Sequence, residues 1–320
     1  MPAKTKYELK TGMATREAFG KALADLGRVN KDVVVCDADL SKSTYTNFFQ
    51  KEFPDRFVEC GIAEANMVAI GAGLASSGKI PFVSSFSCFV MNKGFEQLRV
   101  TAAFPNKNLK VVGTHSGISI GEDGPSQMSI EDLSLACSLP NFTVMCPADE
   151  VAMTALVHAA AEHVGPVFIR AGRAKAAIIY EQGQKFTIGK GIELVEGSDV
   201  TLIATGLLVA EAIRASEALE AQGVSARVID LHTIKPLDVD LIAAAARETK
   251  AIVVCEEHLA DSGLGVRVAQ VVSQTSPCVM EYVGVHGYAE SGSPEALLKK
   301  YGLLSVNIVE AAKKAISRKV

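Results

Sequence analysis

Short apolar runs alternate with helical patterns along the chain, and this rhythm is the feature that most constrains its fold. In the first half, strands are predicted at 32–36, 80–85, 109–114, 142–146 and 166–170, and helices at 14–27, 63–77, 90–103, 129–137 and 149–163. A strand, a helix and another strand, repeated at this spacing, indicate parallel sheets with helices on both faces. The predicted fold class is therefore α/β.

The alternation is interrupted once, by a polar and glycine-rich stretch at about 181–191. It then restarts, with strands predicted at 200–204, 226–231, 251–256 and 278–283, and helices at 207–222, 238–248, 264–274, 294–300 and 307–317. The sequence thus predicts two α/β domains built on parallel sheets, residues 1–182 and a smaller domain at 191–320, joined by a linker. A length of 320 residues is also typical of two domains.

Composition narrows the classes of function. The formal charge of −4 argues against a general nucleic-acid binder, so no nucleic-acid partner is expected. Neither a secretory leader nor an apolar run of membrane-spanning length is found, which favours a cytoplasmic protein without a membrane partner. The seven cysteines lack CxxC spacing and are expected to be free thiols in a reducing compartment, with no metal site in this chain.

One carboxylate lies where an acid is least expected. Glu64 comes directly before an uncharged run, 67–75, that is typical of a buried helix. A buried carboxylate is costly unless it has a partner, so Glu64 is expected to be paired, protonated or bound to a ligand. The alternative is an acid satisfied by the N–H groups and dipole at the start of its own helix.

The densest polar stretch of the chain runs from 113 to 128, between a predicted strand and a predicted helix with Ser129 near its cap. His115 lies at the carboxyl end of that strand, where open α/β sheets bind ligands. Four glycines within the stretch permit unusual backbone conformations and close approach to a ligand. A solvated surface loop is the alternative, but a loop this long and polar favours a functional role.

Two further sets of side chains are candidates. Phe86 and Phe89 can share a helix face and form a platform for a flat ring, although core packing explains aromatic pairs equally well. Arg16 and Arg173, with a serine of the 37–43 loop and a histidine, have the chemistry of a phosphate grip, while exposed salt bridges are the alternative. The sequence assigns no role to His258.

Taken together, these stretches resemble the transketolase family of thiamine-diphosphate enzymes. The resemblance is carried, in the family's order, by Asp37-Ala38-Asp39-Leu40, Gly61-Ile62-Ala63-Glu64, Ser85-Phe86, Gly113-Thr114-His115, Gly121-Glu122-Asp123-Gly124-Pro125-Ser126-Gln127 and Pro147-Ala148-Asp149. It covers nearly the whole chain, which corresponds to the second half of a full-length transketolase. The implied domains are the pyrimidine-binding domain and the C-terminal domain of that family.

The resemblance implies a role for each candidate. Glu64 matches the acid that hydrogen-bonds N1′ of the aminopyrimidine of thiamine diphosphate, and it is a candidate catalytic residue together with His115. Phe86 and Phe89 match the aromatic residues that pack on the same ring. Asp39 lies in the loop that faces the cofactor.

The implied substrate-binding residues occupy the loops around the same edge. Residues that match those holding the sugar phosphate are Arg16, Ser43, His115 and Arg173. Asp123 matches a residue near the hydroxyl groups of the bound sugar. Gln127 departs from the pattern of many bacterial relatives, which have histidine there, although some family members have glutamine.

The family's diphosphate-binding motif, Gly-Asp-Gly followed by an asparagine, is not found in this sequence, whose nearest match is Glu122-Asp123-Gly124. The resemblance therefore implies a separate N-terminal subunit that binds the diphosphate and Mg2+ or Ca2+, in an α2β2 assembly. The implied activity is transfer of a two-carbon ketol unit from a ketose phosphate to an aldose phosphate. The alternatives are half of a deoxyxylulose-phosphate synthase-like enzyme, a 2-oxoacid dehydrogenase E1 β-like chain and a non-catalytic regulatory subunit.

Overall fold

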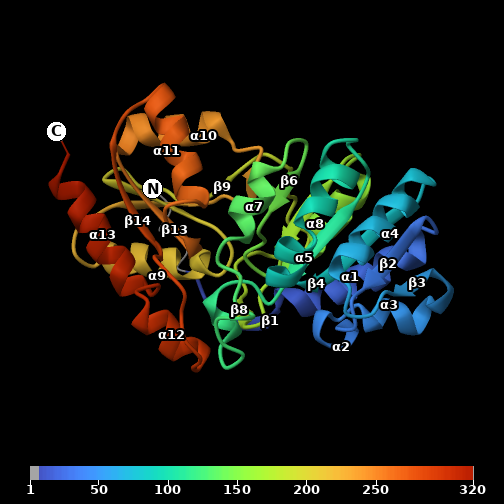
Figure 1. Ribbon diagram of the computed structural model, residues 1–320. Helices are drawn as coiled ribbons and strands as arrows, with labels where there is room; N and C mark the ends of the chain where they lie inside the picture. The colour runs from blue at the N-terminus through green and yellow to red at the C-terminus, as the bar shows by residue number, and fades with distance from the viewer. Residues whose placement is uncertain (1–6, 320) are drawn as a thin grey trace.

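The computed structural model describes residues 7–319, and its architecture follows the predicted alternation of strands and helices (Figure 1). The first sheet contains β2 (Val33–Asp37), β3 (Phe57–Glu59), β4 (Ile80–Phe86), β5 (Lys110–Thr114), β6 (Thr143–Met145), β7 (Val167–Arg170) and β12 (Thr233–Lys235). Their order is β12-β6-β7-β5-β4-β2-β3. All neighbours pair in parallel except β12, which is antiparallel to β6.

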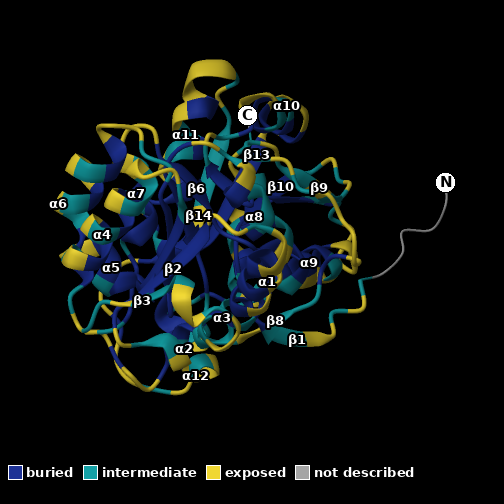
Figure 2. Cartoon of the chain, turned by 90° about the vertical axis from the view of Figure 1, so that its right-hand side faces the viewer, coloured by how far each residue is buried: buried dark blue, intermediate teal, exposed yellow. Residues whose placement is uncertain are grey.

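Helices cover both faces of this sheet. On one face α1 (Thr15–Val29) packs against α8 (Glu150–Glu162), and on the other α4 (Glu64–Ser76), α5 (Ser87–Lys93) and α7 (Asp132–Ser138) follow one another. The short helices α2 (Ser41–Thr44) and α3 (Asn47–Glu52) lie beyond the end of β2. Because both faces are covered, every residue of β2 is buried, and Figure 2 shows the exposed surface on the helices around the strands.

The second sheet repeats the design. It contains β9 (Ile192–Val195), β10 (Val200–Ala204), β11 (Ala226–Asp230), β13 (Ala251–Leu259) and β14 (Val279–Val285), in the order β14-β13-β10-β11-β9 with β9 antiparallel at the edge. One face carries α9 (Leu208–Glu220) and α13 (Ser305–Ser317), and the other α10 (Val239–Thr249) and α11 (Leu264–Thr275), with α12 (Pro294–Lys300) beside the first domain. A small sheet pairs β1 (Thr11–Ala14) with β8 (Lys175–Ala177).

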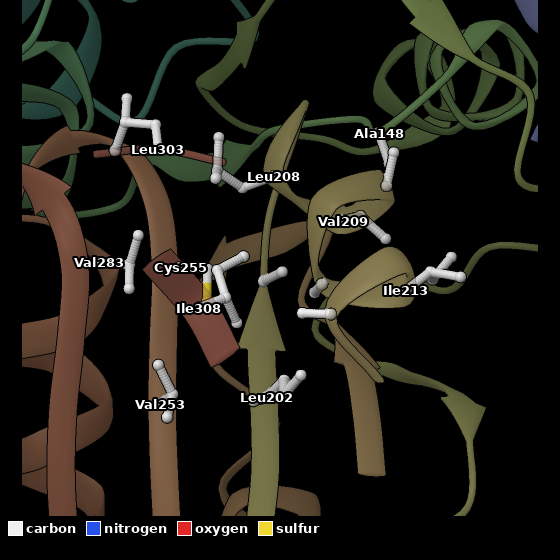
Figure 3. Packing of buried hydrophobic residues seen from close by; sticks show 14 of the residues in the cluster. Ala148, Leu202, Leu208, Val209, Ile213, Val253, Cys255, Val283, Leu303 and Ile308 are labelled. Atoms are coloured by element: carbon white, nitrogen blue, oxygen red, sulfur yellow. The ribbon is translucent and has the colours of Figure 1, made fainter. Parts of the chain in front are cut away.

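The two halves of the chain are joined by more than a linker. β12 follows 191 in the chain, yet it extends the first sheet, with Thr233 opposite Met145. One apolar cluster also spans both halves, and Figure 3 shows Ala148 of the first half beside Val209 of α9. The predicted boundary at 182–191 stays a prediction, and packing runs continuously across it.

Two predicted helices differ from the structure. The helix predicted at 90–103 is three segments, α5, α6 (Phe95–Gln97) and a π-helical turn (Leu98–Ala103). The break falls at Gly94, where an added Cβ would clash with the carbonyl oxygen of Val90. The helix predicted at 129–137 begins at Asp132, because the Ser129 carbonyl instead accepts a hydrogen bond from Gly117 N–H. Ser129 therefore does not cap it.

Three features of the structure bear on the expectations from composition. All seven cysteines are free thiols, and four of them are buried. Among the helices of residues 7–319, none combines the length and the apolar character that a membrane span requires. Within the same range, no group of three or more His, Cys, Asp or Glu side chains could hold a metal ion.

Candidate active site

The strand order of the first sheet gathers the candidate residues at one edge. In the parallel run β7-β5-β4-β2-β3, every strand ends on the same side, so the loops that follow Asp37, Phe86, Thr114 and Arg170 are neighbours. This is the edge at which open α/β sheets bind ligands. Residues more than 150 positions apart in the sequence, such as Arg16 and Arg173, are brought into one electrostatic environment there.

His115 lies at the centre of this edge, one residue beyond β5. Its side chain is only 3 % exposed and its backbone has the left-handed φ of 58°, which is unusual for a residue other than glycine. Nε2 accepts a hydrogen bond from Arg16 Nη1 at 3.2 Å, and Nδ1 lies 2.9 Å from Thr114 Oγ1. Since the Thr114 hydroxyl donates to Ser85 O, the imidazole is assigned as the neutral tautomer with its proton on Nδ1.

Electrostatics favour the same neutral form. Burial lowers the pKa of His115 to about 3, and the positive charges of Arg16 and Arg173 act in the same direction. The imidazole is therefore uncharged throughout the physiological pH range. Its hydrogen-bonding role is that of an acceptor at Nε2, facing the arginine.

Arg16, in the first turn of α1, joins three elements of the edge. Besides the bond to His115, Nη1 donates to Ser43 O at 2.6 Å, and the guanidinium lies 5.1 Å from the centre of the Tyr45 ring. Burial lowers the pKa of Arg16, but Tyr45, Glu17 and Asp123 favour its charged form. Its Nε is buried without a hydrogen-bond partner, so the guanidinium retains a donor for a ligand.

The other predicted sugar-phosphate residues are more open. Arg173 Nη1 donates to Ile120 O at 2.9 Å and lies 3.3 Å from a carboxylate oxygen of Glu122. Asp123 is exposed, within electrostatic reach of Arg16. Gln127 is half-buried and accepts a hydrogen bond from the Ser126 hydroxyl, a contact that does not join it to the arginines.

The two predicted aromatic residues have different surroundings. The Phe86 ring is stacked on the His115 imidazole, with 3.7 Å between ring centres, and is 8 % exposed. Phe89 stacks on Phe86 at 5.5 Å and is half-buried, so it is the more accessible of the two. A flat ligand would therefore meet Phe89, while Phe86 supports both Phe89 and His115 from beneath.

Glu64 is buried at the first position of α4, with 3 % of its side chain exposed. Its carboxylate lies 3.4 Å from Lys93 Nζ, the last residue of α5, whose side chain is 53 % exposed. The same Nζ lies 4.5 Å from the centre of the Phe89 ring. Glu64 is thus paired, as one of the three expectations had it, but its partner is an exposed and flexible side chain that a ligand can displace.

Asp39 lies in an adjacent loop and is exposed, with a φ of 62°. Its N–H donates to a carboxylate oxygen of Glu59, and Gly61 N–H donates to the same oxygen. Glu59 therefore holds the Asp39 loop beside the segment that leads into Glu64. No hydrogen bond or ion pair joins the Asp39 side chain to Glu64 within the described residues.

Sequence reasoning missed several residues that build this edge. Thr114 sets the tautomer of His115, Tyr45 lies under Arg16, and Lys93 pairs with Glu64. Asp37 was noted only as part of a loop, yet it binds Thr44 and Thr46 hydroxyls. Burial raises the pKa of Asp37 to about 6, although the hydrogen bonds from these two threonines act in the opposite direction. A carboxylate that ends an otherwise apolar strand was the available signal for Asp37.

Two domains of a known protein family match this chain. The pyrimidine-binding domain of transketolase matches residues 11–177, and the transketolase C-terminal domain matches residues 189–308. Together these matches cover most of the chain, which belongs to the transketolase family. That family depends on thiamine diphosphate, and its members are transferases.

Individual relatives extend the comparison. Human transketolase is 39 % identical over 322 residues, which cover 99 % of this chain and 51 % of that protein. The protein named "Putative transketolase C-terminal section" from Methanocaldococcus jannaschii is 41 % identical, covering 93 % of this chain and 96 % of its own. A solved structure described as "Split gene transketolase, inactive beta4 tetramer" has a TM-score of 0.91 and 45 % identity, covering 97 % of this chain and 100 % of the other. The chain spans about half the length of the human relative.

Proposed function

We propose that this chain is the C-terminal subunit of a split transketolase, which transfers a two-carbon ketol unit from a ketose phosphate to an aldose phosphate. One observation carries the proposal. A buried acid beside an accessible aromatic ring, Glu64 with Phe89, lies on the same sheet edge as a group of Arg16, His115 and Arg173 suited to a sugar phosphate.

The residues present fit the aminopyrimidine of thiamine diphosphate. Glu64 is the only acid of its helix and is buried, while its ion-pair partner Lys93 is exposed and can move aside. The carboxyl group could then share a hydrogen with N1′ of the ring, and Phe89 could pack on the ring face. When bound, the cofactor would supply the electron sink for cleaving and forming the carbon–carbon bond.

The remaining residues would bind and orient the sugars. Arg16 and Arg173 offer guanidinium donors to a phosphate group, and the unpartnered Nε of Arg16 is free for that purpose. Ser43, on α2 beside Arg16, would complete the phosphate site. His115, neutral and fixed by Thr114, would orient the Arg16 guanidinium toward the sugar phosphate through Nε2, and Asp123 would bind a substrate hydroxyl. Gln127 belongs to this proposal as a weaker substrate contact.

A second chain is part of the proposal. The N-terminal subunit would bind the diphosphate together with Mg2+ or Ca2+, and the two kinds of chain would form an α2β2 assembly. The half-length match to human transketolase and the full-length match to a chain from a split gene support this division. The printed description of that relative as an inactive tetramer of β chains fits the expectation that this chain is inactive alone. The free thiols support a cytoplasmic location.

The reaction is tested by mixing this chain with the partner subunit, thiamine diphosphate and Mg2+. We expect turnover of xylulose 5-phosphate with ribose 5-phosphate, and no turnover by either chain alone. Use of pyruvate in place of the ketose would favour a deoxyxylulose-phosphate synthase-like or E1 β-like enzyme. An assembled complex that is inactive on all of these substrates would favour a regulatory subunit.

The role of Glu64 is tested in the same mixture. Glu64→Ala and Glu64→Gln should each lower kcat by about 100-fold or more, because neither side chain can share an acid proton with the ring. The matched control is Glu96→Ala, which removes an exposed glutamate paired with Arg99 and should leave kcat within about twofold. Full activity of an assembled Glu64→Ala complex would contradict the assignment.

A further inference from the structure

Three consecutive titratable residues lie near the end of β13 in the second domain, and all are buried. Glu256, Glu257 and His258 lie in a strand whose other residues are apolar up to Cys255. Such a run is costly unless each side chain has a partner. Glu256 has one in its own domain, since its two carboxylate oxygens accept from Leu264 and Gly265 N–H at the start of α11. The other two face the first domain.

Glu257 reaches into the His115 segment. Side chains alternate along a strand, so Glu257 points away from the face that Glu256 occupies. Its Oε1 accepts a hydrogen bond from Ser119 N–H at 2.6 Å, although the two residues are 138 positions apart. An added Cβ on Gly117 would overlap the Glu257 carboxyl group, which accounts for glycine at that position. The side chain is only 4 % exposed.

The segment that Glu257 contacts, residues 115–121, has an unusual backbone conformation that must be held by hydrogen bonds. Positive φ angles occur at His115, Gly117 and Gly121. Within the first domain, Ser116 N–H donates to Ala171 O and Gly117 N–H donates to Ser129 O. The next anchor along the segment is the bond from Ser119 to Glu257, and it comes from the second domain.

A second link runs from the same strand to the aromatic pair. Arg170 Nη2 donates to the backbone carbonyl of Glu257 at 2.9 Å, and its Nε lies 2.9 Å from Asp132. Asp132 in turn accepts from the Ser87 hydroxyl at 2.7 Å. Ser87 follows Phe86 directly, at the start of α5. The end of β13 is therefore connected to both halves of the candidate site.

We propose that Glu257 is a positioning residue, through which the second domain fixes the backbone of 115–121 and so holds His115 against Arg16. The substrate class is that of the proposed function, on which this inference rests. Loss of the acceptor would leave Ser119 N–H buried without a partner and release the segment. Because Arg16 and His115 belong to the proposed sugar-phosphate site, their displacement should weaken substrate binding even when the reacting groups are unchanged.

Kinetics of the assembled enzyme provide the first test. We expect Glu257→Ala to raise the KM for xylulose 5-phosphate and ribose 5-phosphate about tenfold, with thiamine diphosphate affinity within about threefold of wild type. Glu257→Gln keeps an oxygen acceptor for Ser119 and should restore KM to within about threefold. Wild-type KM values in the assembled Glu257→Ala enzyme would overturn the proposal.

The matched control is Glu256→Ala, the neighbouring buried glutamate whose contacts stay in the second domain. It should lower stability without raising KM. If Glu256→Ala raised KM as much as Glu257→Ala, the effect would be one of general stability and the proposal would fail.

A second readout needs no turnover and so separates this proposal from the proposed function. In the free chain, amide hydrogen exchange over 115–121 should be about tenfold faster in Glu257→Ala than in wild type. In Glu256→Ala the acceleration should fall instead on 264–268. An unchanged exchange rate at 115–121 in Glu257→Ala would overturn the positioning role, whatever the substrates of the wild-type enzyme.

Discussion

Both sheets are largely parallel, but the polar residues at their carboxyl ends find different kinds of partner. At the first sheet, Arg16 keeps an unpartnered donor, and Glu64 has only an exposed lysine as its ion-pair partner. At the second, Glu256 and Glu257 are bound by backbone N–H groups inside the protein. A sheet edge is thus a candidate site when its polar groups have capacity left for a ligand.

The difference also shows that polar residues at a sheet edge can either hold parts of the protein together or remain available to a ligand. The second edge uses its carboxylates for a helix start and for the joint between the domains. The first leaves its charges beside one another, where a phosphate and a ring nitrogen could satisfy them. Substitutions at three positions probe this contrast.

The largest effect is expected when the buried ion pair of Asp132 and Arg170 is broken. Asp132 is fully buried against Arg170; burial raises its pKa, but Arg170, His258 and hydrogen bonds outweigh this and hold the pKa below its ordinary value. Asp132→Ala would leave the Arg170 charge buried without its partner and should lower the free energy of unfolding by about 3–5 kcal/mol. Urea denaturation of the chain measures it, and a loss below about 1 kcal/mol would show that Arg170 finds another partner.

An intermediate effect is expected at the open edge. Arg16→Ala should lower kcat/KM for phosphorylated sugars about 10- to 100-fold, the value of a lost charged hydrogen bond, while stability changes little. Arg16→Lys should restore only part of the rate, because an ammonium cannot reproduce the guanidinium fork. An equal loss with an unphosphorylated acceptor such as glycolaldehyde would argue against a phosphate contact.

The smallest effect concerns the pH dependence of stability. The folded-state pKa of His115 is lowered to about 3 by burial and by Arg16 and Arg173. As pH falls below about 6.5, His115 becomes protonated in the unfolded chain but stays neutral in the folded chain. Acidification therefore stabilises the unfolded state, and the contribution of His115 to the free energy of unfolding is lost. The difference in the free energy of unfolding between the wild-type chain and His115→Gln should decrease by about 1 kcal/mol from pH 6.5 to pH 5.5. Denaturation curves at the two pH values measure it, and a constant difference would indicate an accessible imidazole.

Much of the fold was predictable because local patterns decide it. The strands predicted at 80–85 and 200–204 agree with β4 and β10 to within one residue, since buried parallel strands are continuous apolar runs. The helix predicted at 90–103 was wrong in its interior, where Gly94 packs against Val90 and the chain changes helix type. β12 was missed because three residues that pair with the edge of a distant sheet carry no pattern of their own.

The sequence by itself determined the alternation of elements, the isolation of Glu64 beside an apolar helix and the polar loop that contains His115. Only the tertiary structure decided which charges meet. It pairs Lys93 with Glu64, and it brings Arg16 to His115 and Glu257 to Ser119 within hydrogen-bond distance. The physical reason is that periodicity and burial are properties of neighbouring residues, whereas strand order and domain packing decide the partner of a charged group, which in these pairs is 29, 99 and 138 positions away in the chain.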